Sequence, residues 1–128
     1  MDATTDELTV DDVHRIFEAW EDKDPVTPSE YWAEEGVYID PHYPDDEYRG
    51  PEEVRRVLES GLEESIAQPR LTIQNVWEDG DAFVVEVRTH HTLIDETEVD
   101  YQQVFVIETR DGKITRWQSY LPFKRPSE

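Results

Sequence analysis

A change of hydrophobic period part-way along the chain constrains the fold more than any other feature of the sequence. From Leu71 onwards apolar and polar residues alternate, and short turn sequences such as Asp79-Gly80-Asp81 and Asp111-Gly112 interrupt the alternation. A period of two is typical of half-buried strands, and Asp-Gly turns connect antiparallel neighbours. We therefore predict four antiparallel strands in a meander, over residues 71–77, 82–93, 99–109 and 114–121, with the middle turn near residues 95–97.

The residues before this point have the period of helices. Thr9 and Asp12 form a capping-box pattern ahead of apolar residues at helical spacing, which predicts a helix of about 12 residues that ends in Glu21-Asp22-Lys23-Asp24-Pro25. Thr27 followed by Pro28 predicts the start of a short second helix. That helix would present Tyr31 and Trp32 and stop at Gly36.

A third helix is expected to begin at Gly50-Pro51 and to bury a stripe that includes Val54, Val57 and Leu58, with Ile66 a candidate for its last turn. Helices in the first half and a meander in the second predict an α+β fold, with the helices packed on one face of an antiparallel sheet. The length of 128 residues suits a single domain over residues 1–128, with loose termini at 1–8 and 123–128.

The net charge limits the classes of partner. The chain carries 32 acidic against 12 basic residues, for a formal charge of -20. Such a charge argues against binding of nucleic acids or anionic membranes, and it suits a halophilic protein whose self-repulsion is screened at about 1 M salt. There is no cysteine, no apolar run of membrane-spanning length and no signal-peptide character after Met1, so a cytoplasmic protein is expected.

The stretch Tyr38-Ile39-Asp40-Pro41-His42 is the strongest candidate for chemistry. Pro41 keeps Asp40 out of the helical region, so a strand through Tyr38 ends here with both side chains on one face. A carboxylate beside an imidazole under aromatic side chains is the arrangement that proton transfer requires. Two simpler interpretations stay open: Asp40 caps a turn, and His42 is a solvated loop residue.

The order of these elements, the strand ending in Asp40-Pro41, and the closing stretch Arg110-Asp111-Gly112-Lys113-Ile114 resemble a known family. They are similar to the SnoaL-like and ketosteroid-isomerase-like proteins of the nuclear transport factor 2 (cystatin-like) fold. The resemblance implies a curved sheet wrapped around the helices into a cone-shaped α+β barrel with one internal pocket. It also implies pairing of two copies through the outer face of the sheet.

The resemblance gives Asp40 the place of the aspartate base of the ketosteroid isomerases, which moves a proton at a carbon next to a carbonyl. Those isomerases also use a tyrosine and a protonated aspartic acid to stabilise the enolate, and the corresponding positions here are near Ile16 and Phe105. Neither side chain can donate a hydrogen bond, so steroid isomerase activity itself is not expected. Tyr38, Tyr101, His42 and His91 are the alternative donors.

The register of the expected meander identifies pocket residues. A three-residue turn at 110–112 would place Phe105 opposite Trp117, and a turn at 95–97 would place His91 opposite Tyr101. The catalytic candidates are then Asp40, His91 and Tyr38, and the expected pocket residues are Trp20, Tyr31, Trp32, His42, Tyr101, Gln103, Phe105, Trp117 and Ser119. If the aromatic side chains fill the cone, no pocket exists.

The opposite face of the expected sheet carries Val104, Val106, Ile114 and Tyr120. These residues are too apolar for a solvated surface, which agrees with a homodimer.

Two functional hypotheses follow. In the first, the protein is an isomerase, cyclase or lyase that acts on a small apolar or aromatic carbonyl compound with Asp40 as base. In the second, it is a non-catalytic ligand-binding or accessory module of the same fold. No glycine-rich phosphate loop is present, and Asp40, His42 and His91 lack the tight spacing of a metal site, so neither a cofactor nor a metal is expected.

Overall fold

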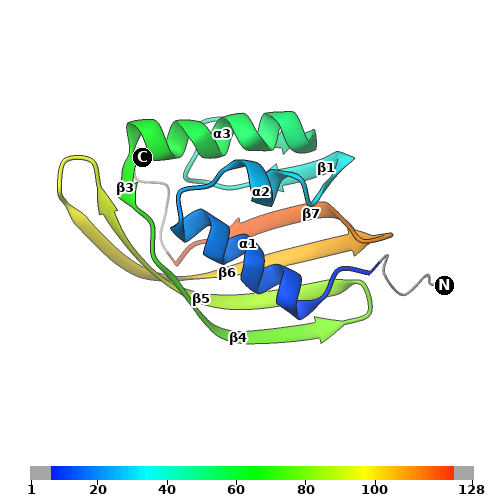
Figure 1. Cartoon of the computed structure of the whole chain (residues 1–128). Helices are drawn as coiled ribbons and strands as arrows, with labels where there is room; N and C mark the ends of the chain where they lie inside the picture. Colours follow the sequence, from blue (N-terminus) through cyan, green and yellow to red (C-terminus); the bar gives the residue numbers. More distant parts are fainter. Residues whose placement is uncertain (1–6, 123–128) are drawn as a thin grey trace.

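The computed structural model describes residues 7–122 and has the α+β architecture, with three helices on the inner side of a strongly curled sheet (Figure 1). The helices are α1 (Val10–Glu21), α2 (Val26–Ser29) and α3 (Gly50–Glu64). The strands are β1 (Trp32–Ile39), β2 (Tyr48–Arg49), β3 (Ile66–Gln68), β4 (Leu71–Asp79), β5 (Ala82–Leu93), β6 (Glu98–Arg110) and β7 (Lys113–Tyr120). The loose termini predicted at 1–8 and 123–128 lie mostly outside the described residues, although Leu8 is buried in the core.

The sheet confirms the predicted meander and adds a parallel pair. Its strand order is β2-β1-β7-β6-β5-β3, and β4 pairs with β5 beside β3. β1 runs parallel to β7, with Tyr38 beside Trp117. The sheet is therefore mixed and not wholly antiparallel as predicted, because the last strand of the meander returns to lie against a strand that precedes α3.

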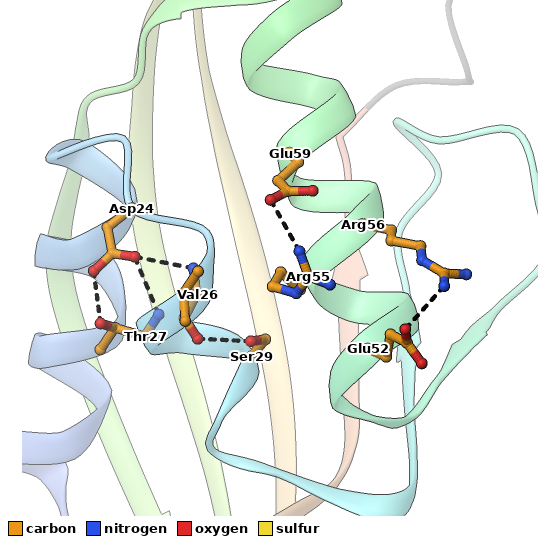
Figure 2. Close-up of polar contacts among 8 residues, drawn as sticks. All are labelled: Asp24, Val26, Thr27, Ser29, Glu52, Arg55, Arg56 and Glu59. Atoms are coloured by element: carbon orange, nitrogen blue, oxygen red, sulfur yellow. Dashed lines mark hydrogen bonds and ion pairs between the residues drawn. The ribbon is translucent and has the colours of Figure 1, made fainter.

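The first helix is confirmed, whereas the second differs from its prediction. The Thr9 hydroxyl accepts from the backbone N–H of Asp12, and the Asp12 carboxylate accepts from the Thr9 N–H, so α1 has the predicted capping box. For α2, the Asp24 carboxylate accepts from the N–H groups of Val26 and Thr27 and from the Thr27 hydroxyl (Figure 2). Thr27 therefore lies inside the helix, which begins at Val26, two residues before the Pro28 that a Thr27 cap indicates.

The predicted end of the second helix at Gly36 is wrong. α2 ends at Ser29, whose hydroxyl donates to the Val26 carbonyl, and β1 already begins at Trp32 (Figure 2). Gly36 lies within β1, where an added Cβ atom would stand 2.3 Å from the carbonyl oxygen of Ile114. The glycine is thus required by the close approach of β1 and β7 and not by the end of a helix.

The third helix has the predicted start and core stripe, with Val54, Val57 and Leu58 buried. Its exposed side carries two ion pairs, and in each the two partners are one helical turn apart. These pairs are Arg55 with Glu59 at 3.1 Å and Arg56 with Glu52 at 2.9 Å (Figure 2). Ile66, a candidate for the last turn, belongs instead to β3 and pairs with Leu93 of β5. The helix axis crosses the open side of the curled sheet in Figure 1, so its buried stripe closes the interior from that side.

Both predicted registers of the meander are shifted by two residues. The β6–β7 turn has two residues and not three, since Arg110 pairs with Lys113, and a bulge at Thr115 adds the missing residue. Phe105 therefore lies opposite Ser119 instead of Trp117. The bulge returns Trp117 to the inner face. Ile114 lies between the turn and the bulge, opposite Thr109, so the shorter turn alone directs it inward, where it is fully buried, and its predicted place on the outer face is wrong.

The β5–β6 turn closes one residue earlier than predicted. Leu93 donates to the carbonyl of Thr97 at 2.8 Å, and Glu96 takes a positive φ of 75° at the third turn position. His91 consequently lies opposite Val99 and not Tyr101, whose partner is Thr89. A two-residue shift keeps every side chain on its predicted face, because side chains alternate with a period of two.

The core lies between the helices and the inner face of the sheet. Aromatic rings dominate it: Phe17 of α1 lies 5.3 Å from Phe105 and 5.6 Å from Trp117, and Trp117 lies 5.4 Å from Trp32, measured between ring centroids. Across residues 7–122 no helix is both long and apolar enough to cross a membrane.

Candidate functional site

A cavity of about 1130 Å³ lies between the helices and the inner face of the sheet. Its wall combines residues of α1 and α3, the loop that follows β1, and the inner residues of β5, β6 and β7. The core aromatics Phe17, Phe105 and Trp117 line one part of this wall and do not fill the interior. The volume is large enough for a small organic molecule, for which a few hundred Å³ (about 300 to 1,000) is typical.

Asp40 enters the cavity wall at the end of β1. β1 stops at Ile39, as the following Asp40-Pro41 pair predicts, and the Asp40 side chain turns inward with 6% of the residue exposed. Its Oδ2 atom accepts a hydrogen bond of 2.6 Å from the Tyr38 hydroxyl. Its Oδ1 atom accepts from the backbone N–H of His42 at 2.9 Å and lies 2.5 Å from His42 Nδ1. Both carboxylate oxygens are therefore occupied by donors from the same short stretch of chain.

These donors decide the ionisation of Asp40. Burial alone would raise the pKa of the carboxyl group, but the hydrogen bond from His42, the positive charge of His42 in its protonated form and the Tyr38 hydroxyl lower the pKa below its usual value. Asp40 is consequently a buried carboxylate that stays ionised. Burial and the charge of Asp40 raise the pKa of Tyr38 well above its usual value. The Tyr38 hydroxyl therefore stays protonated and donates its hydrogen bond to Asp40.

His42 connects Asp40 to a tyrosine of β6, which lies two strands from β1 in the sheet. Its Nε2 atom lies 2.5 Å from the hydroxyl oxygen of Tyr101 on β6. Because the ionised Asp40 accepts from Nδ1, a neutral His42 carries its proton there and its Nε2 lone pair accepts from Tyr101. Burial and the Asp40 charge raise the pKa of Tyr101, which keeps this hydroxyl protonated. Asp40, His42 and Tyr101 form one hydrogen-bonded chain, called the polar triad below.

His91 lines the cavity as an uncharged histidine. Burial first, and then the nearby charges of His42 and Arg70, lower the pKa of His91 to about 4. Its Nδ1 atom accepts a hydrogen bond of 3.1 Å from the backbone N–H of Arg70, so the imidazole proton sits on Nε2. His91 therefore offers a neutral N–H donor in the same cavity as the polar triad.

Gln103 brings an unsatisfied polar group to the cavity wall. The residue is 4% exposed, and its Nε2 group donates a buried hydrogen bond of 2.6 Å to the hydroxyl of Thr89. Its Oε1 atom is buried without a hydrogen-bond partner among the described residues, and the same holds for the indole N–H of Trp117. An unpaired buried polar atom of this kind costs about 1–3 kcal/mol, which a bound group could recover.

Comparison with known proteins gives the family. The model of the SnoaL-like domain family matches residues 13–117, most of the chain. The chain belongs to the SnoaL-like family. The predicted resemblance to this family and to the ketosteroid-isomerase-like and nuclear transport factor 2-like fold is thereby confirmed, and no curated protein matches the chain.

Solved structures share the fold of this SnoaL-like protein at low identity. A ketosteroid-isomerase-like protein from Catenulispora acidiphila, in complex with trimethylamine, is 19% identical, with a TM-score of 0.77 over 88% of this chain and 84% of that chain. An LEH-like epoxide hydrolase from M. tuberculosis is 21% identical, with a TM-score of 0.71 over 85% and 78%. A proposed SnoaL-like polyketide cyclase from Jannaschia is 18% identical, with a TM-score of 0.72 over 88% and 84%. Such identities establish the common fold alone.

Ten of the twelve site residues predicted from the sequence line the cavity: Trp20, Trp32, Tyr38, Asp40, His42, His91, Tyr101, Gln103, Phe105 and Trp117. Tyr31 and Ser119 do not. The Tyr31 hydroxyl donates to Asp12 of α1 at 3.3 Å, away from the cavity of this SnoaL-like chain. Ser119 is buried on the inner face, and its hydroxyl has no partner among the described residues.

Two tyrosines of the wall were missed by the reasoning from sequence. Tyr43 and Tyr48 follow Asp40 in the loop and in β2, and their ring centroids lie 6.2 and 6.4 Å from that of Tyr38. Tyr43 packs against α3 at Gly61, where an added Cβ atom would stand 2.6 Å from the tyrosine hydroxyl. The signal in the sequence that could have identified them is the concentration of tyrosines between residues 38 and 48.

The residues that the structure describes contain no group of three or more His, Asp or Glu side chains arranged to hold a metal ion. The polar triad places a carboxylate-oriented imidazole and a phenol in the cavity wall, an arrangement that can move protons to and from a bound molecule.

Proposed function

We propose that this SnoaL-like protein binds a small apolar or aromatic carbonyl compound in its cavity and moves a proton at the carbon next to the carbonyl. The observation that carries the proposal is the polar triad, which joins a buried, ionised carboxylate to an imidazole and a phenol at the wall of an aromatic cavity. The fold is shared with an epoxide hydrolase and a proposed cyclase, which makes small-molecule chemistry a reasonable expectation.

Within this proposal the imidazole of His42 is the base. Asp40 holds the imidazole proton on Nδ1 and stabilises the imidazolium once Nε2 has accepted a proton from the substrate. The Tyr101 hydroxyl, released from Nε2 when substrate binds, donates to the developing enolate oxygen, as does the neutral N–H of His91. Return of this proton from His42 Nε2 to a different carbon of the enolate system completes an isomerisation. If the Nε2 proton is first replaced by one from water, its delivery to the original carbon completes an exchange with solvent. Asp40, predicted from the sequence as the base, becomes the positioning residue, because both its oxygens are already bonded.

Proton exchange on a ketone tests this proposal without knowledge of the natural substrate. The probe is 2-tetralone, whose carbonyl lies next to acidic C–H bonds and an aromatic ring. Proton NMR in D₂O would follow the loss of the α-proton signals, and wild-type protein is expected to accelerate it above the buffer rate. His42→Gln should reduce the acceleration by about 100-fold or more, the usual contribution of a general base.

His90→Gln is the matched control. His90 is the neighbour of His91 on β5, but it faces outward and pairs with Glu98 at 2.6 Å. The control variant should exchange protons at the wild-type rate. Equal rates for wild type and His42→Gln, with both folded, would refute the role of the polar triad.

A second candidate function is a non-catalytic ligand-binding module. The specific observation in its favour is that Ile16 and Phe105, to which the family resemblance assigns the places of the enolate donors, are apolar residues of the cavity wall. A relative of the same fold has been crystallised with trimethylamine, a small molecule with no acidic carbon. Tight binding of 2-tetralone by calorimetry without any acceleration of exchange would favour this second function.

We also propose that two copies pair through the outer face of the sheet. Val84, Val104 and Val106 point outward there, and Trp77 and Tyr120 are 55% and 47% exposed. Apolar side chains gathered in this way mark protein interfaces. Sedimentation equilibrium should give twice the chain mass for wild type, and Trp77→Glu should weaken the association. A monomeric wild type at about 0.1 mM protein in both low and high salt would refute the pairing.

A further inference from the structure

The unpaired amide oxygen of Gln103 identifies what a ligand of this cavity must carry. Gln103 and Tyr101 are two residues apart on β6 and share the inner face of the sheet, so the amide lies next to the phenol of the polar triad. Thr89, fully buried on the adjacent strand β5, accepts from the Gln103 amide nitrogen and fixes the orientation of the amide. The Oε1 atom is the end of the amide that this contact leaves without a partner in the described chain.

We infer that Gln103 is a specificity residue whose amide oxygen accepts a hydrogen bond from a hydroxyl group on the ligand, so that the preferred ligands are hydroxylated aromatic molecules. The inference rests on the proposed function, because it assigns the ligand class of the same cavity. A hydroxyl is the group that the wall selects, since a ligand that lacks a donor leaves the buried oxygen unpaired. Sites built to bond a ligand hydroxyl reject the analogue that lacks it more strongly than an apolar wall rejects an added hydroxyl.

A pair of matched probes tests the inference on the intact protein. The probes are 2-naphthol and 2-methylnaphthalene, which have the same ring system and substituents of similar size, one a donor and the other apolar. Titration calorimetry of wild type is expected to give a dissociation constant roughly tenfold or more lower for 2-naphthol. In Gln103→Met, which keeps the length of the side chain but removes the amide, the two dissociation constants should become equal within about twofold.

Gln102→Met is the matched control, because Gln102 is the next residue along β6 and its amide bonds to Gln74 on the outer face. This variant should keep the wild-type preference. A third probe, 2-methoxynaphthalene, accepts but does not donate, and wild type should bind it as weakly as 2-methylnaphthalene. This comparison needs no variant, so it tests the inference even if Gln103→Met does not fold.

Three outcomes contradict the inference in distinguishable ways. Equal binding of 2-naphthol and 2-methylnaphthalene by wild type would overturn the role of Gln103 and leave the proposed function standing. A preference for 2-naphthol that persists in Gln103→Met would assign the hydroxyl to another group. If no probe binds wild type, the cavity is not a site for aromatic ligands, and the proposed function falls together with this inference.

Discussion

His91 gives the protein a pH dependence of stability that follows directly from its burial. The histidine titrates at a pKa of about 4 in the folded protein against an ordinary value of 6.5. Between these values the unfolded chain binds a proton that the folded chain excludes, so stability falls as the pH is lowered from about 6.5 towards 4. Above pH 6.5 both states are neutral at this residue, and the contribution of His91 is constant.

The size of the effect follows from the two pKa values. At about pH 5, nearly all His91 in the unfolded chain is charged and nearly all in the folded chain is neutral, which lowers the free energy of unfolding by about 2 kcal/mol relative to pH 8. His91→Asn removes this titration and keeps an acceptor near the position of Nδ1, so the N–H of Arg70 retains a partner. The variant should be less stable than wild type at pH 8 and lose about 2 kcal/mol less on acidification to pH 5.

Urea unfolding followed by tryptophan fluorescence at constant ionic strength measures both quantities. His90→Asn is the control, because His90 is an outward-facing neighbour that is partly exposed beside Glu98. Its loss of stability between pH 8 and 5 should exceed that of His91→Asn. If wild type and His91→Asn lose the same free energy over this range, His91 is not a buried neutral histidine and its proposed role as an uncharged donor is refuted.

Three further predictions concern the packing and the charge. Gly36→Ala should destabilise the protein by more than about 3 kcal/mol in urea unfolding, because the new methyl group overlaps the Ile114 carbonyl of β7; a loss below about 1 kcal/mol would contradict the close approach of β1 and β7. Tyr38→Phe should cost about 1–3 kcal/mol and raise the pKa of Asp40, so that acid unfolding begins at a higher pH; an unchanged acid midpoint would show that the Tyr38–Asp40 bond is absent. With a net charge of -20, the unfolding midpoint should rise steadily from about 0.1 M to 2 M NaCl, and a midpoint independent of salt would end the halophilic interpretation.

Local signals in the sequence predicted most of the elements, and several of the errors arose where distant segments decide. The capping box of Thr9 was read correctly because all its atoms lie within one turn. At α2 the error was local: Asp24 and Thr27 are both capping residues by type, and the N–H groups of Val26 and Thr27 bond to the Asp24 carboxylate. Gly36 looks like a helix stop in the sequence, yet its reason is a strand that arrives about 80 residues later.

The inner face of the sheet was predicted better than its register. Both turns were misplaced, but the bulge at Thr115 compensated for a turn that is one residue shorter than predicted, so Trp117 kept its face. Ile114 lies on the turn side of that bulge, where the shorter turn is not compensated, so it changed face. The sequence does not indicate this bulge, because a threonine such as Thr115 is acceptable on either face of the sheet.

In the candidate site too, the contact between residues close in the sequence could be predicted, and the contact between distant residues could not. That Asp40 and His42 meet could be predicted, because they flank a proline at the end of a strand. That Tyr101 completes the chain could not, because His42 and Tyr101 are 59 residues apart and meet only through the curl of the sheet. The lowered pKa of Asp40 also depends on its donors, which sequence reasoning had not counted.

The protonation of the His42 ring tests the central claim most directly. Nitrogen-15 NMR of labelled protein at about pH 8 distinguishes a proton on Nδ1 from one on Nε2, and Asp40→Ala identifies which signals belong to the ring that Asp40 orients. The account predicts that His42 carries its proton on Nδ1 towards Asp40 and that this preference disappears in Asp40→Ala. A proton on Nε2 in the wild-type protein would contradict it, because the base of the proposed reaction would then have no lone pair facing Tyr101 and the cavity.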